Sequence, residues 1–266
     1  MREPGEHAQG PGLRKGDVEP LSGAGVTGEA QPGSEGCVAE QGAFRTVGLY
    51  SGALGIAYNP QQIRRLGVEP PRCWKDLVRP EFERQVMMGN PTSSGTGYLI
   101  LSALTQLLGE DGAFAYMKTL HRNVAQYTHG GRGSIENVVR GEASVAIGFM
   151  HDAITAQERG GRLEFTLPCE GAPVEIGSLS LVAGSANPVE ARQFYEWALS
   201  PEAQTLARQA SAFQWPSNTQ VSAVAGLPTP DLAGIIAYDH RRFGSSEVRK
   251  RLLTRWVDEV NAPGNE

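Results

Sequence analysis

Cysteine and long apolar runs are both scarce in this chain of 266 residues. The three cysteines, Cys37, Cys73 and Cys169, are widely spaced and form no CxxC pair, which argues against zinc-binding and thioredoxin-type motifs. Three cysteines allow one disulfide in an oxidising compartment, and the sequence does not say which two would form it. No apolar run approaches the ~20 residues that a membrane-spanning helix needs.

Basic charge is scarce as well. Lysine and arginine total 24 against 29 aspartates and glutamates, which gives a formal net charge of −5. Domains that bind nucleic acid usually carry a strongly basic face, so this balance argues against a nucleic acid as partner. Local arginine clusters, such as Arg241-Arg242, are interpreted as solvated surface.

The first part of the chain differs in composition from the rest. Residues 1–42 are rich in Gly, Pro, Glu and Ser and have no apolar periodicity. Such a segment buries too little apolar surface to offset the entropy of ordering, so we expect a disordered tail. Its first residues also lack the apolar core of a secretory signal, so the chain as written has no predicted export route.

From residue 43 onwards, apolar strand-like segments alternate with segments of helical periodicity. Strands are predicted at 46–58, 85–88, 143–149, 163–167 and 178–183, and helices at 61–66, 96–108, 111–120, 135–140, 151–159, 188–199, 201–210 and 247–260. This alternation predicts α/β architecture with a largely parallel or mixed sheet.

Several short segments are distinctive when they are taken together and in order. They are LGIAYN at 54–59, WKDL at 74–77, NPTSSGTG at 90–97, GEASVAIG at 141–148, ANP at 186–188 and LSPEAQ at 199–204. Between about residues 47 and 218 this series resembles the type II periplasmic solute-binding proteins of ABC transporters. It is most similar to the branch that binds ferric iron, phosphonates and sugar phosphates.

The resemblance implies two lobes joined by hinge strands. It assigns residues 43–56 to the crossing between the lobes, 57–178 to a complete second lobe, and 179–266 to the return into the first lobe. The predicted strand at 178–183 would be the returning crossing. Family members have a long segment before the first crossing, where this chain has its low-complexity tail, so the resemblance implies an incomplete N-terminal lobe.

One candidate binding loop precedes the predicted helix at 96–108. Ser93, Ser94, Gly95 and Thr96 stand where a helix N-terminus would offer unpaired N–H groups and the positive end of its dipole. The hydroxyl groups add donors, so the loop suits a phosphate or a carboxylate. The alternative interpretation is an ordinary N-cap with a glycine turn.

A second glycine-rich loop, at 128–134, precedes the next predicted helix. Gly133 would let the backbone approach a ligand, and Arg132 would pair with a phosphate through two hydrogen bonds. Ser134 is predicted to cap the helix at 135–140 and to face the same ligand. The alternative is a flexible surface loop.

His151 and Asp152 follow the buried strand at 143–149, at the kind of strand end where open α/β sheets bind ligands. From the residues alone, the pair is equally compatible with a helix start. The resemblance to sugar-phosphate-binding members implies that His151, Asp152 and Glu175 accept hydrogen bonds from sugar hydroxyls. Iron-binding members have neighbouring tyrosines here, and Met150-His151-Asp152 contains none.

The expected function is therefore capture rather than catalysis. The resemblance implies a substrate-binding component of an ABC importer, which closes on a small anionic solute such as a phosphorylated sugar or a phosphonate. Its partner would be an ABC permease in the inner membrane, and it would work in the periplasm as a monomer. We expect no cofactor, no resident metal and no catalytic residue.

Three alternatives remain at this stage. The first is a ferric-iron-binding protein of the same family, and the second is a truncated remnant without a transport role. The third is a hydrolase that uses Ser93 or Ser94 with His151 and Asp152. The chain has no GxSxG motif, and a base adjacent in sequence to its carboxylate seldom has the required orientation, so the hydrolase is the weakest alternative.

Overall fold

The computed structural model describes residues 39–40, 43–44, 46–182, 184–222 and 234–262. The tail predicted to be disordered therefore lies almost wholly outside the described residues. The strands are β1 (Ala39–Glu40), β2 (Ala43–Phe44), β3 (Val47–Tyr58), β4 (Val86–Gly89), β5 (Val124–Thr128), β6 (Val145–Phe149), β7 (Glu164–Thr166), β8 (Val174–Leu179) and β9 (Trp215–Pro216).

Helices alternate with these strands through most of the chain. They are α1 (Pro60–Leu66), α2 (Gly95–Leu108), α3 (Glu110–Asn123), α4 (Gly131–Arg140), α5 (Met150–Glu158), α6 (Pro188–Ala198), α7 (Pro201–Gln209), α8 (His240–Gly244) and α9 (Ser246–Glu259). Two short 3₁₀ helices, η1 (Trp74–Val78) and η2 (Pro80–Phe82), precede β4. Within the described part of the chain, no helix has the length and apolar character that crossing a membrane requires.

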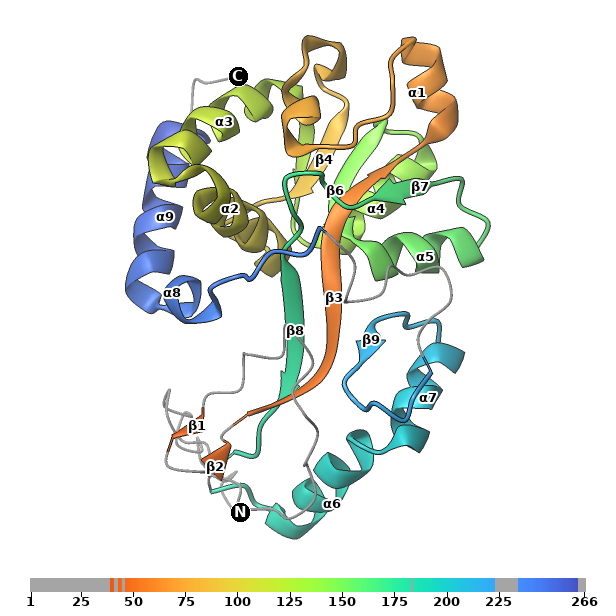
Figure 1. The fold of residues 1–266 in the computed structure, drawn as a ribbon, viewed down its shortest axis with the longest axis vertical. Helices are drawn as coiled ribbons and strands as arrows, with labels where there is room; N and C mark the ends of the chain where they lie inside the picture. Colours follow the sequence, from red (N-terminus) through yellow and green to blue (C-terminus); the bar gives the residue numbers. More distant parts are fainter. Residues whose placement is uncertain (1–38, 41–42, 45, 183, 223–233, 263–266) are drawn as a thin grey trace, which may run out of the picture.

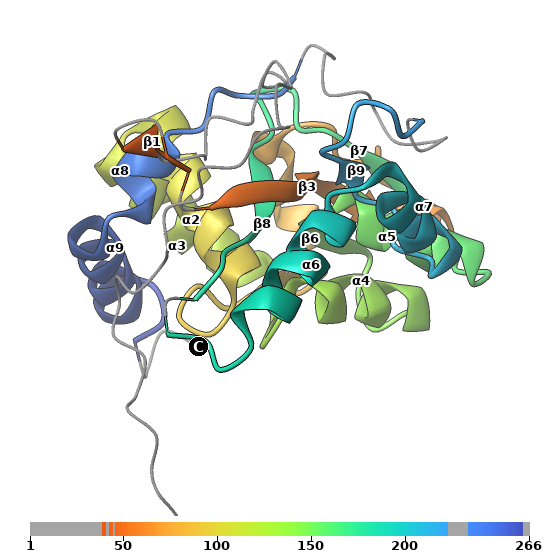
Figure 2. The ribbon, with the colours of Figure 1, turned by 90° about the horizontal axis from the view of Figure 1, so that it is seen from below.

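The molecule has a larger part, which contains α1–α5, β4–β7, α8 and α9, and a smaller part, which contains α6, α7 and β9. A mixed sheet forms the centre of the larger part. Its strand order is β5-β4-β6-β3-β7, with β4 parallel to β5 and β6 and with β3 antiparallel to β6 and β7. In Figure 2, α2, α3 and α9 lie to one side of β3, and α4 and α5 lie to the other. Both faces of the sheet are covered, which explains why β4 and β6 consist of buried residues throughout.

Successive strand residues point to opposite faces and enter two separate cores. The face towards α2 and α3 presents Ile56, Met88 and Ile147, which pack with the buried residues of those helices. The face towards α4 and α5 presents Ala57 and Ala146, among other residues. The alternation therefore fixes the register of each strand, because a shift by one residue would exchange the two faces.

One strand connects the larger part to the smaller part of the molecule. The second half of β3, from Leu54 to Tyr58, pairs with β6, and its first half, from Val47 to Ala53, pairs antiparallel with β8. Figure 1 shows β3 and β8 running side by side from the upper part towards α6, α7 and β9. We call this pair, Val47–Ala53 with Val174–Leu179, the connecting ribbon.

The position of the returning strand corrects the prediction from the sequence. It was expected at 178–183, whereas β8 occupies Val174–Leu179. The sequence periodicity extends across both ranges. The register with β3 decides between them, because Ala53 pairs with Val174 and Val47 with Leu179.

The C-terminal helices lie outside the part to which the resemblance assigns them. The resemblance implies that all of 179–266 returns to the first lobe, whereas α8 and α9 lie beside α2 and α3 (Figure 1). Phe243, Leu252 and Trp256 are buried in the same core as Leu101 and Phe114. Apolar packing therefore places these helices with the larger part, although the chain reaches them only after passing through α6 and α7.

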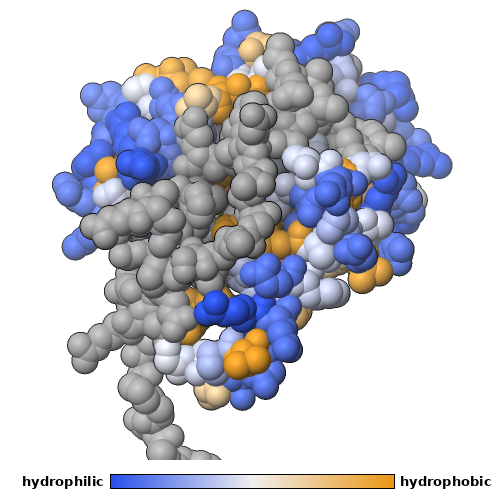
Figure 3. Space-filling model, turned by 60° about the horizontal axis from the view of Figure 1, so that its bottom comes forward, coloured by the Kyte–Doolittle hydropathy of each residue, from blue (hydrophilic) through white to orange (hydrophobic). Residues whose placement is uncertain are grey.

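The smaller part buries less of its apolar surface than the larger part. Val189, Phe194 and Trp197 of α6 have exposed fractions of 63%, 59% and 49%. On the face of the molecule drawn in Figure 3, hydrophobic areas are separated by hydrophilic ones. Where the two parts meet, Ala53, Met150, Val174 and Trp215 form a small apolar cluster.

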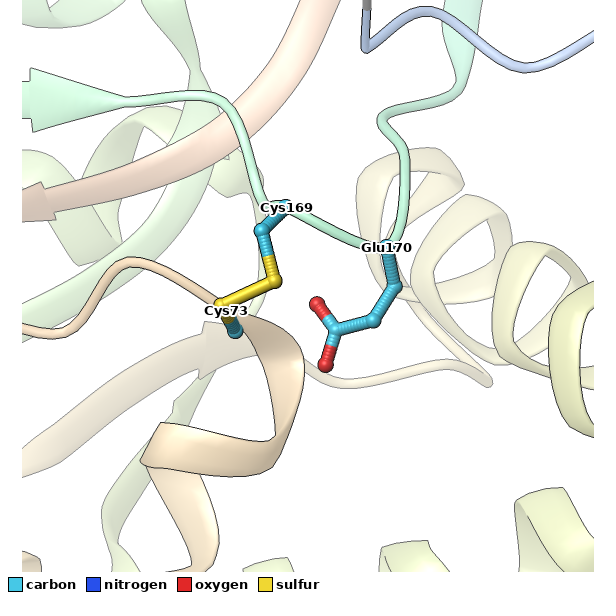
Figure 4. Close-up of side chains that lie close together, drawn as sticks. All are labelled: Cys73, Cys169 and Glu170. Atoms are coloured by element: carbon cyan, nitrogen blue, oxygen red, sulfur yellow. A yellow bond between two sulfur atoms is a disulfide. The ribbon is translucent and has the colours of Figure 1, made fainter.

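A disulfide fixes the segment that leads into β8. Cys73 and Cys169, which are 96 residues apart in sequence, are bonded, and this assigns the pair that the sequence left open. Figure 4 shows Glu170 beside this bond. Its carboxylate oxygens accept hydrogen bonds from the N–H groups of Trp74, at 2.7 Å, and Lys75, at 3.0 Å. The indole of Trp74 donates to the carbonyl of Gly171 at 3.0 Å.

Loss of this disulfide is predicted to destabilise the larger part of the molecule. A crosslink that closes a long loop restricts the unfolded chain, so the Cys73→Ser/Cys169→Ser variant should lose ~2–4 kcal/mol of unfolding free energy. Urea denaturation of the oxidised protein and of the variant measures the loss. Cys37→Ser, which leaves the bond intact, is the matched control. Equal midpoints for the oxidised protein and the double variant would contradict the prediction.

Candidate functional site

The predicted binding loops meet at one edge of the sheet. Because β5, β4 and β6 are parallel neighbours, their carboxyl ends lie together, and α2, α4 and α5 begin there. The N–H group of Asn90 donates to the carbonyl of Thr128 at 2.8 Å, which joins the loops after β4 and β5. Leu54 pairs with Phe149 at this edge, so the connecting ribbon leaves the sheet beside it.

The N-terminus of α2 has the geometry of an N-cap and retains free donors. The hydroxyl oxygen of Ser94 accepts a hydrogen bond from the N–H group of Gly97 at 3.2 Å, and Ser94 is buried. Ser93 and Gly95 are exposed, and Thr96 is 8% exposed. The N–H groups of Gly95 and Thr96 find no hydrogen-bond partner among the described residues. The N-cap interpretation therefore holds for Ser94, and the two unpaired N–H groups are the feature on which the prediction of an anion site depends.

The loop before α4 differs from its prediction. The helix begins at Gly131 with Gly130 as N-cap, so Ser134 lies inside the first turns and does not cap the helix. Ser134 is fully buried and shares a hydrogen bond of 2.8 Å with the hydroxyl of Thr128. Its hydroxyl therefore holds two protein segments together. The glycines allow the earlier helix start, which residue types alone did not predict.

Arg132 and Gly133 lie in the first turn of α4 at the same edge. The Arg132 side chain is 52% exposed, and its Nε lies 3.4 Å from a carboxylate oxygen of Glu136 one turn further on. Exposed ion pairs of this kind contribute little to stability, so Arg132 can exchange this partner for another anion at small cost. Gly133 is partly exposed.

His151 is held against the connecting ribbon. It lies in the first turn of α5, is 8% exposed, and stacks on Phe149 with ring centroids 5.1 Å apart. A Cβ atom at Gly52 of β3 would lie 2.5 Å from His151 Nδ1, so the imidazole occupies the space that this glycine leaves. Within the described part of the chain, Nδ1 has no hydrogen-bond partner.

Burial sets the charge of His151. Desolvation, with a smaller contribution from the positive charge of Arg132, lowers the pKa of His151 to about 4. The imidazole is therefore neutral at neutral pH. Its Nε2 lies 4.0 Å from a carboxylate oxygen of Asp152, but a neutral ring and a carboxylate at this distance do not form an ion pair.

The two carboxylates of the cluster come from different elements. Asp152 belongs to α5, and Glu175 lies on β8 directly opposite Gly52. Burial raises the pKa of both groups, and the negative charge of Asp152 raises the pKa of Glu175 further. Asp152 also lines a pocket of about 190 Å³ between α4 and α5, together with Arg132. The structure thus brings His151, Asp152 and Glu175 to one place.

Two residues of this cluster were missed in the sequence. Tyr50 and Gly52 of β3 lie on the same face of the connecting ribbon as Glu175 and Gly177, because Tyr50 pairs with Gly177 and Gly52 pairs with Glu175. The only signal in the sequence is a glycine at positions 52 and 177 of otherwise strand-like segments. Glycine in a strand often marks a close approach of another group.

The geometry offers no support for the hydrolase alternative. With His151 Nε2 towards Asp152, the nitrogen left to accept a serine proton is Nδ1, which lies over Gly52 of β3, and the Ser94 hydroxyl caps α2. In the described part of the chain, one three-residue group has the spacing of metal ligands, namely Cys73, Cys169 and Glu170. Its two sulfur atoms are joined in the disulfide, so it does not offer two thiolates to a metal ion.

Comparison with known proteins identifies the architecture. Residues 29–245 match the family described as bacterial extracellular solute-binding protein. The periplasmic binding protein AfuA of Actinobacillus pleuropneumoniae, solved with exogenous fructose-6-phosphate bound, superimposes with a TM-score of 0.78 at 39% identity, over 82% of this chain and 69% of that one. This similarity confirms the predicted α/β fold of the type II periplasmic binding proteins.

Two curated relatives extend the comparison. An uncharacterized protein of Haemophilus influenzae is 40% identical over 214 residues, which cover 80% of this chain and 62% of the relative. The Fe(3+)-binding periplasmic protein of Serratia marcescens is 24% identical over 226 residues, which cover 81% of this chain and 63% of the relative. The chain therefore spans less than two thirds of the length of these two relatives.

Burial of His151 predicts a distinctive dependence of stability on pH. Because the folded imidazole has a pKa of about 4, the unfolded state binds a proton that the native state excludes as pH falls from about 6.5 towards 4. Relative to His151→Gln, the wild-type protein should lose about 2.5 kcal/mol of unfolding free energy between pH 8 and pH 4.5. The raised pKa values of Asp152 and Glu175 act in the opposite direction, but they are present in both proteins.

Urea denaturation of both proteins at several pH values tests this expectation. The comparison uses the change with pH, so a constant loss of packing in the glutamine variant does not affect it. Parallel curves of stability against pH would contradict the burial of a neutral His151.

Proposed function

The chain belongs to the family of bacterial extracellular solute-binding proteins, and we propose that it is the solute-binding component of an ABC importer that captures a phosphorylated sugar. One observation carries the proposal. The free N–H groups at the start of α2 lie at the same sheet edge as His151, Asp152 and Glu175. The ligand would then present an anion to the first group and hydroxyls to the second.

The anionic end of the ligand would bind at the helix N-termini. Gly95 and Thr96 offer unpaired N–H groups, the positive end of the α2 dipole favours a negative charge, and Ser93 adds an exposed hydroxyl. Arg132 lies at the start of α4 and would exchange its exposed pairing with Glu136 for the ligand. Phosphates, phosphonates and carboxylates share this chemistry.

The other end of the ligand would bind at His151, Asp152 and Glu175. An ionised carboxylate only accepts hydrogen bonds, so two partly buried carboxylates favour a ligand with several donors. Sugar hydroxyls meet that need, whereas inorganic phosphate at neutral pH offers few donors. AfuA, which is 39% identical to this chain, was solved with fructose-6-phosphate, and this supports a sugar phosphate over a simple phosphonate.

The connecting ribbon gives the proposed capture a mechanical basis. Two paired strands form the β3–β8 link between the larger and the smaller part, and the candidate site lies where these strands leave the sheet. Bending of the ribbon would close the smaller part over a ligand held at the edge. The closed form would dock on an ABC permease of the inner membrane, with the binding protein in the periplasm.

Ferric iron is the second candidate. It is favoured by the relative from Serratia marcescens and by Tyr50, which the structure brings to the side of Glu175 although the sequence has no tyrosine next to His151. A phenolate is the form that binds ferric iron, and burial together with Glu175 and Asp152 raises the pKa of Tyr50. The surroundings of Tyr50 therefore disfavour that form, and the sugar phosphate remains the preferred ligand.

A thermal-shift screen tests the proposal. The purified chain is heated with fructose 6-phosphate, glucose 6-phosphate, fructose, an aminoalkylphosphonate, inorganic phosphate and ferric citrate. A ligand at a hundredfold excess over its Kd should stabilise the folded state by about 2.7 kcal/mol. We expect sugar phosphates to raise the melting temperature clearly, and fructose or phosphate alone to raise it little.

Substitutions locate the binding. Glu175→Gln and Asp152→Asn should weaken the shift given by the sugar phosphate, because each replaces an acceptor-only group. Glu142→Gln is the matched control, since this carboxylate pairs with Arg140 at the surface, next to the start of β6. A shift that survives both site substitutions, or the absence of a shift with every sugar phosphate, would exclude the proposed site.

A further inference from the structure

Tyr50 occupies a position that no motif in the sequence indicated. It lies on β3 within the connecting ribbon and pairs with Gly177 of β8. A Cβ atom at Gly177 would lie 2.1 Å from Cζ of Tyr50 and less than 3 Å from both Cε atoms. The ring therefore leans across the ribbon and covers Gly177, with its hydroxyl end over β8.

The same arrangement is repeated one step along the ribbon. The next pair on this face is Gly52 with Glu175, and there the ring of His151 fills the space above the glycine. In each pair one strand contributes a glycine, and a ring occupies the space that a Cβ atom there would fill. Both rings therefore lie close to the backbone on the face of the connecting ribbon that carries Glu175, where a larger residue in place of either glycine would hold the ring away.

The register of the ribbon places Tyr50 on the same face as Glu175, in the neighbouring pair on that face. Burial first, and then the negative charges of Glu175 and Asp152, raise the pKa of Tyr50. The phenol therefore stays protonated at neutral pH and keeps a hydrogen to donate. Within the described part of the chain, this hydroxyl has no hydrogen-bond partner, and the tyrosine is only partly buried.

We propose that Tyr50 is a ligand-binding residue that selects a ligand hydroxyl able to donate to a carboxylate and to accept from the phenol at the same time. The inference rests on the proposed function and narrows its substrate class. The partly buried pair of carboxylates accepts from any donor, including an amine. A neighbouring phenol donates a hydrogen bond, so the ligand must also offer an acceptor. A sugar hydroxyl can accept this hydrogen bond, whereas a protonated amine cannot.

The test is the affinity of Tyr50→Phe for sugar phosphates by isothermal titration calorimetry. The substitution keeps the ring over Gly177 and removes only the hydroxyl. We expect fructose 6-phosphate or glucose 6-phosphate, whichever the wild type binds more tightly, to bind about tenfold more weakly to the variant. Ser51→Ala is the matched control, because Ser51 is the next residue on the opposite face of β3, and its affinity should equal that of the wild type.

A double-mutant cycle tests the role of Gly177. Gly177→Ala should displace the ring and weaken binding in the wild-type background, but it should have little effect in a Tyr50→Ala background, where no ring remains to be displaced. Urea denaturation of each variant shows whether the fold is retained. Equal losses in the two backgrounds would mean that Gly177 acts independently of Tyr50, against the inference.

The outcomes separate the two proposals. If the wild type binds a sugar phosphate and Tyr50→Phe binds it equally well, the role of Tyr50 is refuted and the proposed function stands. If the wild type binds no sugar phosphate, both proposals fail. Binding of ferric citrate with a visible absorption band that Tyr50→Phe abolishes would assign the phenol to a metal ion instead, and would overturn its role as a donor to a hydroxyl.

Discussion

The structure depends on one strand that belongs to two sheets. β3 pairs with β6 and β7 through its second half, and with β8 and β9 through its first half. Antiparallel pairing along the 12 residues of β3, with one shift of register between Gly48 and Tyr50, fixes the direction in which the chain leaves the larger part. It also fixes which side chains face the carboxyl ends of the parallel strands. The fold and the candidate site are therefore set by the same hydrogen-bond register.

The candidate site combines groups with opposite requirements. The first turns of α2 and α4 suit an anion, whereas Asp152 and Glu175 are themselves anions and are partly removed from water. A free carboxylate in such surroundings costs solvation energy until a donor reaches it. A ligand with a charged end and a hydroxyl-bearing end resolves both requirements at once. This pairing is the physical reason why the arrangement favours capture of one bifunctional molecule.

Rigidity is distributed unevenly around this site. The disulfide between Cys73 and Cys169, and the hydrogen bonds from Trp74 and Lys75 to Glu170, fix the segment before β8 to the larger part. Beyond the sheet edge the ribbon has fewer buried residues, since the first five residues of β3 are only partly buried. Regions with few buried contacts are where proteins open or bend most easily. The ribbon is therefore where the bending that we propose for capture would be concentrated.

The sequence by itself determined the α/β alternation, most of the helices, the loops after β4 and β6, and the family resemblance. Local periodicity and residue type are sufficient for these features. Only the tertiary structure decided that Ser134 is internal, that β8 lies at Val174–Leu179, that α8 and α9 join the larger core, and that Tyr50 and Gly52 lie on the same face as Glu175. Apart from Ser134, whose partner Thr128 is nearby in sequence, each of these depends on a partner far away along the chain. Such a partner is selected by strand register and packing, which no local pattern records.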